Sequence, residues 1–256
     1  MIYVLRYGLI VLYTAIWSSI AIVIAVFDRS GDAHIWAARQ WVRWILWTCG
    51  IEVRAEGLEE LTAQGPPAAA VWMSNHRSVF DTAAIIATLP VSFRFVAKRE
   101  LTWIPIFGWA LLAAGHVIVD RSDRQSSIAS MKRAAERLAH GMNVIVFPEG
   151  RRSRTGELAE FKSGGFHLAI EAGVPVIPIS VTGSTQITPK HSLRVESGRI
   201  CVRYGAPMPT ADLDAGDRNE LKAAVRRAIL VGLRDLDRPD ELRESSPNPR
   251  LGFDSN

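Results

Sequence analysis

A stretch of 21 residues near the N-terminus, Tyr7–Phe27, contains no charged side chain and is almost entirely apolar. At about 1.5 Å per residue, a helix of this length is about 31 Å long, which is enough to cross the hydrocarbon core of a bilayer. Arg6 precedes the stretch and Asp28-Arg29 follow it, so charged residues mark both ends. The run is too long for a cleaved signal peptide, and no small-residue cleavage site follows it. The stretch therefore predicts a membrane-embedded helix.

A second helix is expected over Ala33–Thr48. Arg39 and Arg43 are four residues apart and share one face of it, whereas most other positions are apolar and four are tryptophan: Trp36, Trp41, Trp44 and Trp47. Trp and Arg together are typical of a helix in the headgroup region of a membrane. We expect a helical hairpin in the membrane, or a span followed by an interfacial helix. The alternative is an amphipathic helix packed on the rest of the protein. The flanking charges are too few to fix an orientation.

From Gly50 onward, short apolar runs alternate with stretches of helical pattern. This alternation predicts an α/β fold, a mostly parallel mixed sheet flanked by helices and preceded by the N-terminal membrane-associated two-helix segment. The expected strands are Ala68–Trp72, Phe93–Ala97, His116–Val119, Asn143–Phe147 and Val176–Val181. The expected helices are Thr82–Leu89, Ile104–Ala114, Ser126–His140, Phe161–Ala172 and Arg218–Leu236. A hairpin is expected from Ser192 to Tyr204, with its turn at Ser197-Gly198.

The sequence is thus divided into three parts. Residues 1–49 are expected to form a membrane anchor, residues 50–238 the α/β domain that would carry any catalytic site, and residues 239–256 a flexible tail rich in Pro, Ser, Asn and Arg.

The stretch Ser74-Asn75-His76-Arg77-Ser78-Val79-Phe80-Asp81 carries the strongest signal for chemistry, because it lies between an expected strand and an expected helix. On a regular helix, residues five apart point about 140° from each other. His76 and Asp81 can therefore meet only if His76 lies in the turn and Asp81 in the first turn of the helix. Asp81 would then hold one imidazole nitrogen and leave the other to act as a general base. Alternatively, Asp81 only caps the helix as part of a capping box that begins at Ser78.

A second candidate site follows the strand Asn143–Phe147, where Pro148-Glu149 are followed by Gly150, Arg151, Arg152 and Ser153. Glycine lets the backbone approach a ligand closely, and a guanidinium binds a phosphate through two parallel hydrogen bonds. Lys98, after another expected strand, is a further candidate for a phosphate contact. The alternative is a solvated basic loop. The apolar residues Trp103–Ala114 suit either a slot for a hydrocarbon chain or packing in the core.

Composition narrows the classes of partner. The formal charge of +4 and the pI of about 9.3 favour anionic partners. The arginines lie in short loops without interleaved aromatic residues, which argues against nucleic-acid binding. Cys49 and Cys201 are far apart and are expected to be buried thiols, and no spacing indicates a metal site or a bound cofactor. The chain has no Gly-x-Ser-x-Gly, P-loop or HExxH motif.

Four stretches together resemble the 1-acyl-sn-glycerol-3-phosphate acyltransferases (lysophosphatidic acid acyltransferases), which are glycerolipid acyltransferases with an HxxxxD motif. They occur in the family's order between about residues 70 and 182. The matching residues are Asn75-His76 through Asp81; Lys98, Ile104-Pro105, Gly108, Gly115 and Asp120-Arg121; Phe147-Pro148-Glu149-Gly150 with Arg152 and Ser153; and Val174-Pro175-Val176-Ile177-Pro178.

The resemblance implies a function. An acyl group would pass from acyl-CoA or acyl carrier protein to the sn-2 hydroxyl of 1-acyl-glycerol-3-phosphate, forming phosphatidic acid without a metal or cofactor. His76 would be the general base and Asp81 would orient it. Arg152 would hold the acceptor phosphate, Glu149 and Gly150 would shape that loop, and Lys98 would assist. The partners would be a lysophospholipid and membrane lipids, in the inner membrane of a bacterium with the catalytic domain facing the cytoplasm.

One departure concerns the acceptor. Arg151 stands where the family usually has Thr. The additional guanidinium would either tighten phosphate binding or indicate a different acidic head group. Two alternatives therefore stay open: the same chemistry on another lysolipid, and a non-catalytic membrane module that binds anionic lipid.

Overall fold

The computed structural model describes residues 2–28, 32–63, 65, 67–153, 156–188 and 194–238. The expected tail at 239–256 lies outside these residues, as do Arg29 and Ser192.

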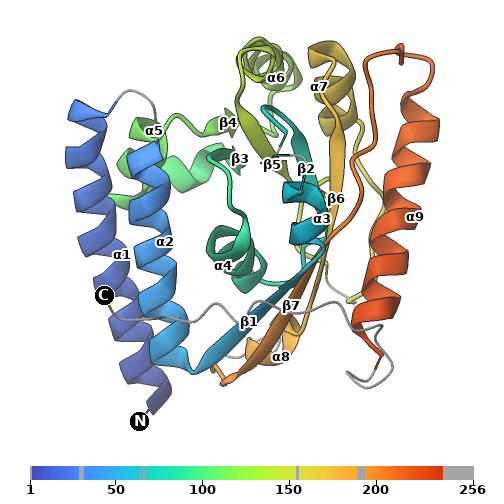
Figure 1. Ribbon diagram of the computed structural model, residues 1–256. Coiled ribbons are helices and arrows are strands. Elements are labelled where there is room, and N and C mark those ends of the chain that lie inside the picture. The colour runs from blue at the N-terminus through green and yellow to red at the C-terminus, as the bar shows by residue number, and fades with distance from the viewer. Residues whose placement is uncertain are drawn as a thin grey trace.

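Within the described residues, seven strands form one sheet in the order β1-β7-β6-β2-β5-β3-β4 (Figure 1). Neighbouring strands run parallel, except that β6 and β7 are antiparallel. The mostly parallel mixed sheet predicted from the sequence is therefore confirmed. The strands are β1 (Ile51–Glu56), β2 (Val71–Ser74), β3 (Phe93–Lys98), β4 (Val117–Val119), β5 (Asn143–Val146), β6 (Val176–Thr182) and β7 (Gly198–Tyr204).

The helices lie close to where the sequence pattern predicts them. The last one has the predicted bounds, whereas α5 begins three residues late because a 3₁₀ turn and Pro105 precede it. The helices are α1 (Ile2–Phe27), α2 (Asp32–Cys49), α3 (Leu58–Thr62), α4 (Val79–Thr88), the 3₁₀ helix η1 (Arg99–Trp103), α5 (Phe107–Ala113), α6 (Arg124–Ala139), α7 (Gly164–Ala172), α8 (Ser184–Ile187) and α9 (Arg218–Leu236).

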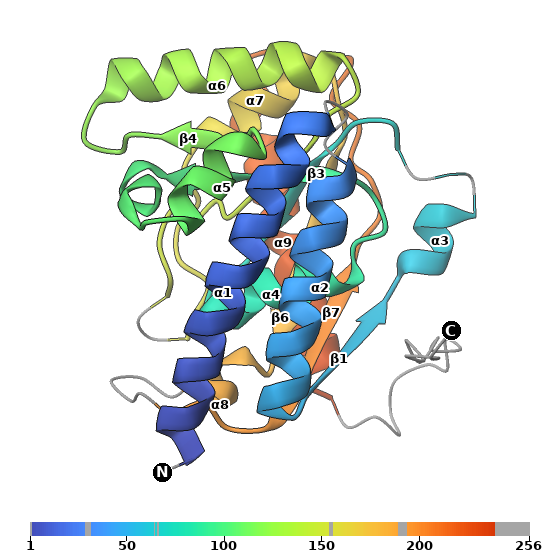
Figure 2. The same cartoon turned by 90° about the vertical axis from the view of Figure 1, so that its left-hand side faces the viewer.

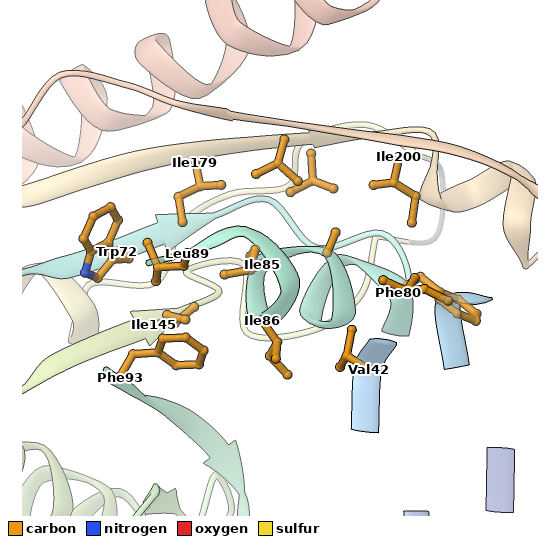
Figure 3. Packing of buried hydrophobic residues seen from close by; sticks show 14 of the residues in the cluster. Val42, Trp72, Phe80, Ile85, Ile86, Leu89, Phe93, Ile145, Ile179 and Ile200 are labelled. Atoms are coloured by element: carbon orange, nitrogen blue, oxygen red, sulfur yellow. The ribbon is translucent and has the colours of Figure 1, made fainter. Parts of the chain in front are cut away.

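A hydrophobic cluster lies on each face of the sheet, so the central strands are buried on both sides. Trp72 of β2 points to the face covered by α4 and α2, whereas its neighbours Val71 and Met73 point to the face covered by α6, α7 and α9. Figure 3 shows the first cluster, in which Ile85 of α4 and Leu89, the residue after the helix, pack against the strands. The continuous apolar strand sequences follow from this two-sided burial.

The N-terminal helices lie side by side against one flank of the sheet domain (Figure 2). Among the described residues, α1 is the one helix that is long and apolar enough to cross a membrane. Val42 of α2 belongs to the same hydrophobic cluster as the buried residues of α4. The Arg39 guanidinium, also on α2, donates a hydrogen bond to the carbonyl of Leu89 at 2.7 Å. The opposite side of α2 exposes tryptophans, including Trp47. The helix thus packs on the domain, as the alternative interpretation expected, and also keeps an exposed aromatic face.

The expected hairpin from Ser192 to Tyr204 is wrong. The expected turn at Ser197-Gly198 is the start of β7, and none of the described residues 194–197 is in a strand. β7 instead lies between β6 and β1 and pairs with both. β1 has no counterpart among the expected strands. Gly198 donates its N–H to the carbonyl of Gly50. The strand therefore pairs with a segment far away in the sequence rather than with the residues just before it.

Asn75, which follows β2, links the end of that strand to the neighbouring strand β6. Its side-chain amide donates to the carbonyl of Val181 at 2.9 Å, and its Oδ1 accepts from the N–H of Val181 at 2.8 Å. Asn75 is only 1% exposed, so both bonds are shielded from water. This pairing fixes the turn that follows β2.

Replacing Asn75 by alanine should therefore lower the free energy of unfolding by about 2–4 kcal/mol, since two buried backbone groups of Val181 lose their partner. Denaturant unfolding in detergent micelles measures the loss. Gln186→Ala, at an exposed position, serves as the control and should change stability by less than about 0.5 kcal/mol. Equal stabilities of the two variants would show that the Asn75 bridge contributes nothing.

Candidate active site

The loops that carry the candidate residues meet at one edge of the sheet. β2, β5 and β3 are neighbours and run parallel, so their carboxyl ends lie together. His76 follows β2, Gly150 follows β5, and Lys98 ends β3. In open parallel sheets, ligands typically bind outside the carboxyl ends of the strands.

His76 and Asp81 meet as the sequence requires. α4 begins at Val79 with Ser78 as its N-cap, so Asp81 is in the first turn and His76 is in the loop before it. His76 Nδ1 lies 3.1 Å from Asp81 Oδ2. The same oxygen accepts the backbone N–H groups of Arg77 and Ser78, at 2.6 and 2.7 Å. The capping box and the His–Asp pair, which the sequence leaves as alternatives, therefore coexist on one carboxylate oxygen.

This geometry leaves the second imidazole nitrogen available. Asp81 is fully buried and its Oδ2 acts as an acceptor, so His76 Nδ1 carries the hydrogen of the neutral ring. His76 Nε2 then has a lone pair, and the side chain is 18% exposed. The ring of Phe147 stacks on the imidazole, with 4.0 Å between the ring centroids. The imidazole is held on two sides and open at Nε2.

The loop after β5 is tied to the backbone of His76. Glu149 is 3% exposed, and its Oε1 accepts the N–H of His76 at 2.7 Å while its Oε2 accepts the N–H of Ala159 at 3.0 Å. The N–H of Ser153 donates to the carbonyl of His76 at 2.8 Å. Glu149 thus positions both loops from inside, and the hydroxyl of Ser153 is engaged with the carbonyl of Glu157.

Four cationic side chains surround the same loop. Arg151 and Arg152 are exposed, and no hydrogen bond or ion pair joins either to another described residue. The Arg121 guanidinium donates to the carbonyl of Gly150. Lys162 lies over Gly150, where a Cβ would come within 2.9 Å of its Cδ and Cε atoms. Gly150 has φ of 72°, so both its conformation and its close neighbour favour glycine.

Sequence reasoning did not assign a role to Arg121 or Lys162. Arg121 belongs to the second matched stretch, which was the available signal, whereas Lys162 has no motif of its own. Lys98 was expected to help with phosphate, and in the structure it forms an ion pair with Glu100 at 2.5 Å.

An apolar cavity of about 130 Å³ lies between α1, α2, α4, α5 and β3. Phe107, Ala110 and Leu111 line it, as the slot interpretation of Trp103–Ala114 predicts. Phe95 lines it as well, and its ring is stacked parallel to that of Phe147, which in turn covers His76. The rings of Phe95 and Phe147 thus separate the cavity from the imidazole of His76.

The part of the chain that the structure describes holds no group of three or more His, Cys, Asp or Glu side chains arranged to bind a metal ion. Cys49 and Cys201 are buried, as expected, and neither forms a disulfide with a described residue.

A family profile described as "Acyltransferase" matches residues 52–182, which include β1 through β6 and both candidate loops. The chain belongs to the acyltransferase family. Among its relatives, a 1-acyl-sn-glycerol-3-phosphate acyltransferase of Cocos nucifera is 29% identical over 231 residues, covering 88% of this chain and 72% of that protein. The corresponding alpha enzyme of Homo sapiens is 35% identical over 188 residues, covering 73% of this chain and 65% of that protein. The chain spans 58% of the relative from Limnanthes douglasii, which is 34% identical over 169 residues and 66% of this chain.

A solved structure has the same fold. The 1-acyl-sn-glycerophosphate (LPA) acyltransferase of Thermotoga maritima matches with a TM-score of 0.78 and 23% identity, over 96% of this chain and 97% of that chain. The similarity includes the N-terminal helices, because it extends over nearly the whole length of both chains.

His116 lines the cavity and provides a pH-dependent contribution to stability. The N–H of Phe95 donates to His116 Nδ1 at 2.9 Å, and burial, reinforced by the Arg94 guanidinium, lowers the pKa of His116 to about 3. In the unfolded chain the pKa is about 6.5, so between these values the unfolded state binds more protons. The contribution is fully present above pH 6.5 and is lost as the pH falls toward 3.

A His116→Asn variant keeps an acceptor for the N–H of Phe95 and removes the titration. The wild type should lose stability more steeply than the variant between pH 6.5 and pH 4, by up to about 1.4 kcal/mol per pH unit. Unfolding free energies measured at several pH values test this. Parallel pH profiles for the two proteins would contradict it.

Proposed function

We propose that this protein transfers a fatty acyl group from a thioester to the sn-2 hydroxyl of 1-acyl-glycerol-3-phosphate, forming phosphatidic acid for phospholipid biosynthesis. The observation that carries the proposal is the His76–Asp81 pair, which lies between a cationic loop and an apolar cavity. A lysophosphatidic acid needs this combination, because its reacting hydroxyl lies between a phosphate and a hydrocarbon chain. The printed names of the relatives support the same acceptor.

In the proposed mechanism, His76 Nε2 takes the proton of the acceptor hydroxyl while the hydroxyl oxygen attacks the thioester carbonyl carbon. The tetrahedral intermediate then collapses, the carbon–sulfur bond breaks, and the leaving thiolate takes the proton back from the imidazolium. Asp81 holds Nδ1–H and stabilises the transient positive charge on the ring. The products are an ester and a free thiol.

The donor enters this mechanism only through its thioester. Acyl-CoA and acyl carrier protein present the same phosphopantetheine thioester, so the proposed chemistry is common to both. The apolar cavity beside Phe95 suits the hydrocarbon chain of a substrate.

The acceptor phosphate is proposed to bind at the loop after β5. Arg152 and Arg151 supply guanidinium groups, Gly150 lets the ligand approach the backbone, and Arg121 and Lys162 add positive charge from neighbouring segments. Glu149 and Ser153 shape the loop through their bonds to the backbone of His76. Lys98, which is exposed at the same sheet edge, remains an assisting candidate.

The proposed location is the inner membrane of a bacterium, with the active site facing the cytoplasm. α1 is long and apolar enough to lie within a bilayer, where both lipid substrate and lipid product reside. The two buried cysteines, which form no disulfide among the described residues, suit a reducing compartment.

A second candidate keeps this chemistry but uses another acidic lysolipid, and the observation that favours it is the exposed guanidinium of Arg151 where the family usually has Thr. Acyl transfer by the purified protein in lipid, with lysophosphatidic acid beside other lysolipids, distinguishes the two. Transfer to none of them by folded protein would instead favour the non-catalytic lipid-binding module.

His76→Ala should lower kcat by about 10²–10⁴-fold, because the base that removes the hydroxyl proton is gone, while binding to vesicles stays unchanged. Steady-state acyl transfer and vesicle flotation measure the two effects. His140→Ala is the matched control, since His140 is an exposed histidine at the end of α6 and should leave kcat as it is. Full transfer by the His76→Ala variant would refute the general-base role.

Arg152→Ala should raise the KM for the phosphorylated acceptor by about ten- to hundredfold and leave the KM for the donor unchanged, because a charged hydrogen bond to phosphate is lost. The control is Arg227→Ala, which removes an exposed arginine from α9. An unchanged acceptor KM and kcat would place the phosphate elsewhere.

A further inference from the structure

The segment formed by η1 and α5 has a second apolar face that points away from the cavity. Phe107 and Ala110 point inward, whereas four large side chains point outward and are 46–68% exposed. We call these four the outer face of α5: Trp103, Ile104, Trp109 and Leu112. Packing in the core, one of the two interpretations from the sequence, does not account for them.

The composition of the segment is that of a membrane-contacting element. From Leu101 to Gly115 there is no charged residue, and charged residues resume only at both ends, at Lys98-Arg99-Glu100 and at Asp120-Arg121. Tryptophan and aliphatic side chains flanked by basic residues are typical of segments that lie at a bilayer interface.

Several backbone N–H groups of this segment are hydrogen-bonded within the segment itself, as an apolar surrounding favours. At its tip, the N–H of Ile104 donates to Leu101 and the N–H of Gly108 donates back to Ile104, at 3.3 and 2.7 Å. The N–H of Phe107 donates to the carbonyl of Pro105, which itself has no N–H to satisfy. The tip can therefore leave water without exposing these donors.

The tip is also rigid. Ile106 has φ of 64°, which is unusual for a β-branched residue and persists only where the surroundings impose it. A Cβ on Gly108 would lie 2.3 Å from the carbonyl oxygen of Thr102, so only glycine permits η1 and α5 to approach this closely. The fold thus holds the outer face of α5 in one orientation.

The position of α1 beside this face indicates what covers it. α5 packs directly against α1, and both lie on the flank that faces the viewer in Figure 2. The exposed side of α1 is itself apolar, including Val11 and Leu12, and the helix is long enough to be embedded in a bilayer. The outer face of α5 continues this surface on a separate part of the chain.

We infer that the outer face of α5 inserts into the bilayer in which α1 is embedded and is a membrane contact of the sheet domain itself. Its opposite side forms a wall of the cavity, so the cavity lies at the lipid surface. The inference concerns the surface that contacts lipid and is independent of the reaction that the protein catalyses.

The test places an environment-sensitive fluorophore on the full-length protein at Ile104→Cys and, separately, at Trp109→Cys. Both native cysteines are buried, so the introduced thiol is the reactive one. The matched control is Val231→Cys, which is 54% exposed on α9, on the opposite side of the molecule from α1 (Figure 1). Each protein is reconstituted into phospholipid vesicles with and without nitroxide-labelled lipid.

The expected result is a blue-shifted emission at positions 104 and 109 that nitroxide lipid quenches, with an aqueous, unquenched emission at position 231. Aqueous emission at 104 and 109 from protein that floats with the vesicles would overturn the inference. A blue shift that needs no lipid and grows with protein concentration would also overturn it, because a second copy of the chain would then cover this face.

Discussion

The arrangement of the candidate site depends on one buried carboxylate oxygen, Asp81 Oδ2. It accepts two backbone N–H groups at the start of α4 and also holds the imidazole of His76. The two backbone N–H groups belong to the cap of α4, so the carboxylate that holds His76 is also part of the helix N-terminus. Since Asp81 is fully buried, its direction is fixed by these bonds rather than by solvent. Local helix formation and the proposed chemistry therefore require the same rotamer of one side chain.

The loop after β5 depends on a second buried acid. Glu149 bridges the N–H of His76 and the N–H of Ala159, and so it joins the turn after β2 to the chain that leads into α7. This arrangement keeps the negative charge of Glu149 inside and leaves Arg151 and Arg152 outside, where an anionic ligand can reach them. The cationic loop is thereby built on a buried acid that does not compete for the ligand.

Sequence reasoning succeeded where short-range chemistry decides the outcome. The turn position of His76, the helical position of Asp81 and the five strands β2 to β6 follow from local spacing and apolar runs, and they agree with the structure. It failed where distant segments decide. β7 pairs with β1 and β6 rather than with its own neighbourhood, and Arg121 reaches Gly150 from another loop, whereas Lys162 reaches it from the far end of the same connection between β5 and α7. The sequence also does not show which side chains of α5 point into the cavity and which point outward, because this depends on the segments packed against the helix.

The hydroxyl of Tyr3 hydrogen-bonds to the carboxylate of Glu196, which lies 193 positions later in the chain. The N-terminal helices are synthesised before α4 and α5, which pack against them, and well before the segment that holds Glu196. Long-range contacts of this kind form slowly, because the intervening chain must be ordered before they are gained. Until those later segments are made, α1 and α2 have mainly each other as packing partners. The rest of their apolar surface is not yet covered by protein at that stage, and exposed apolar surface of this kind favours aggregation.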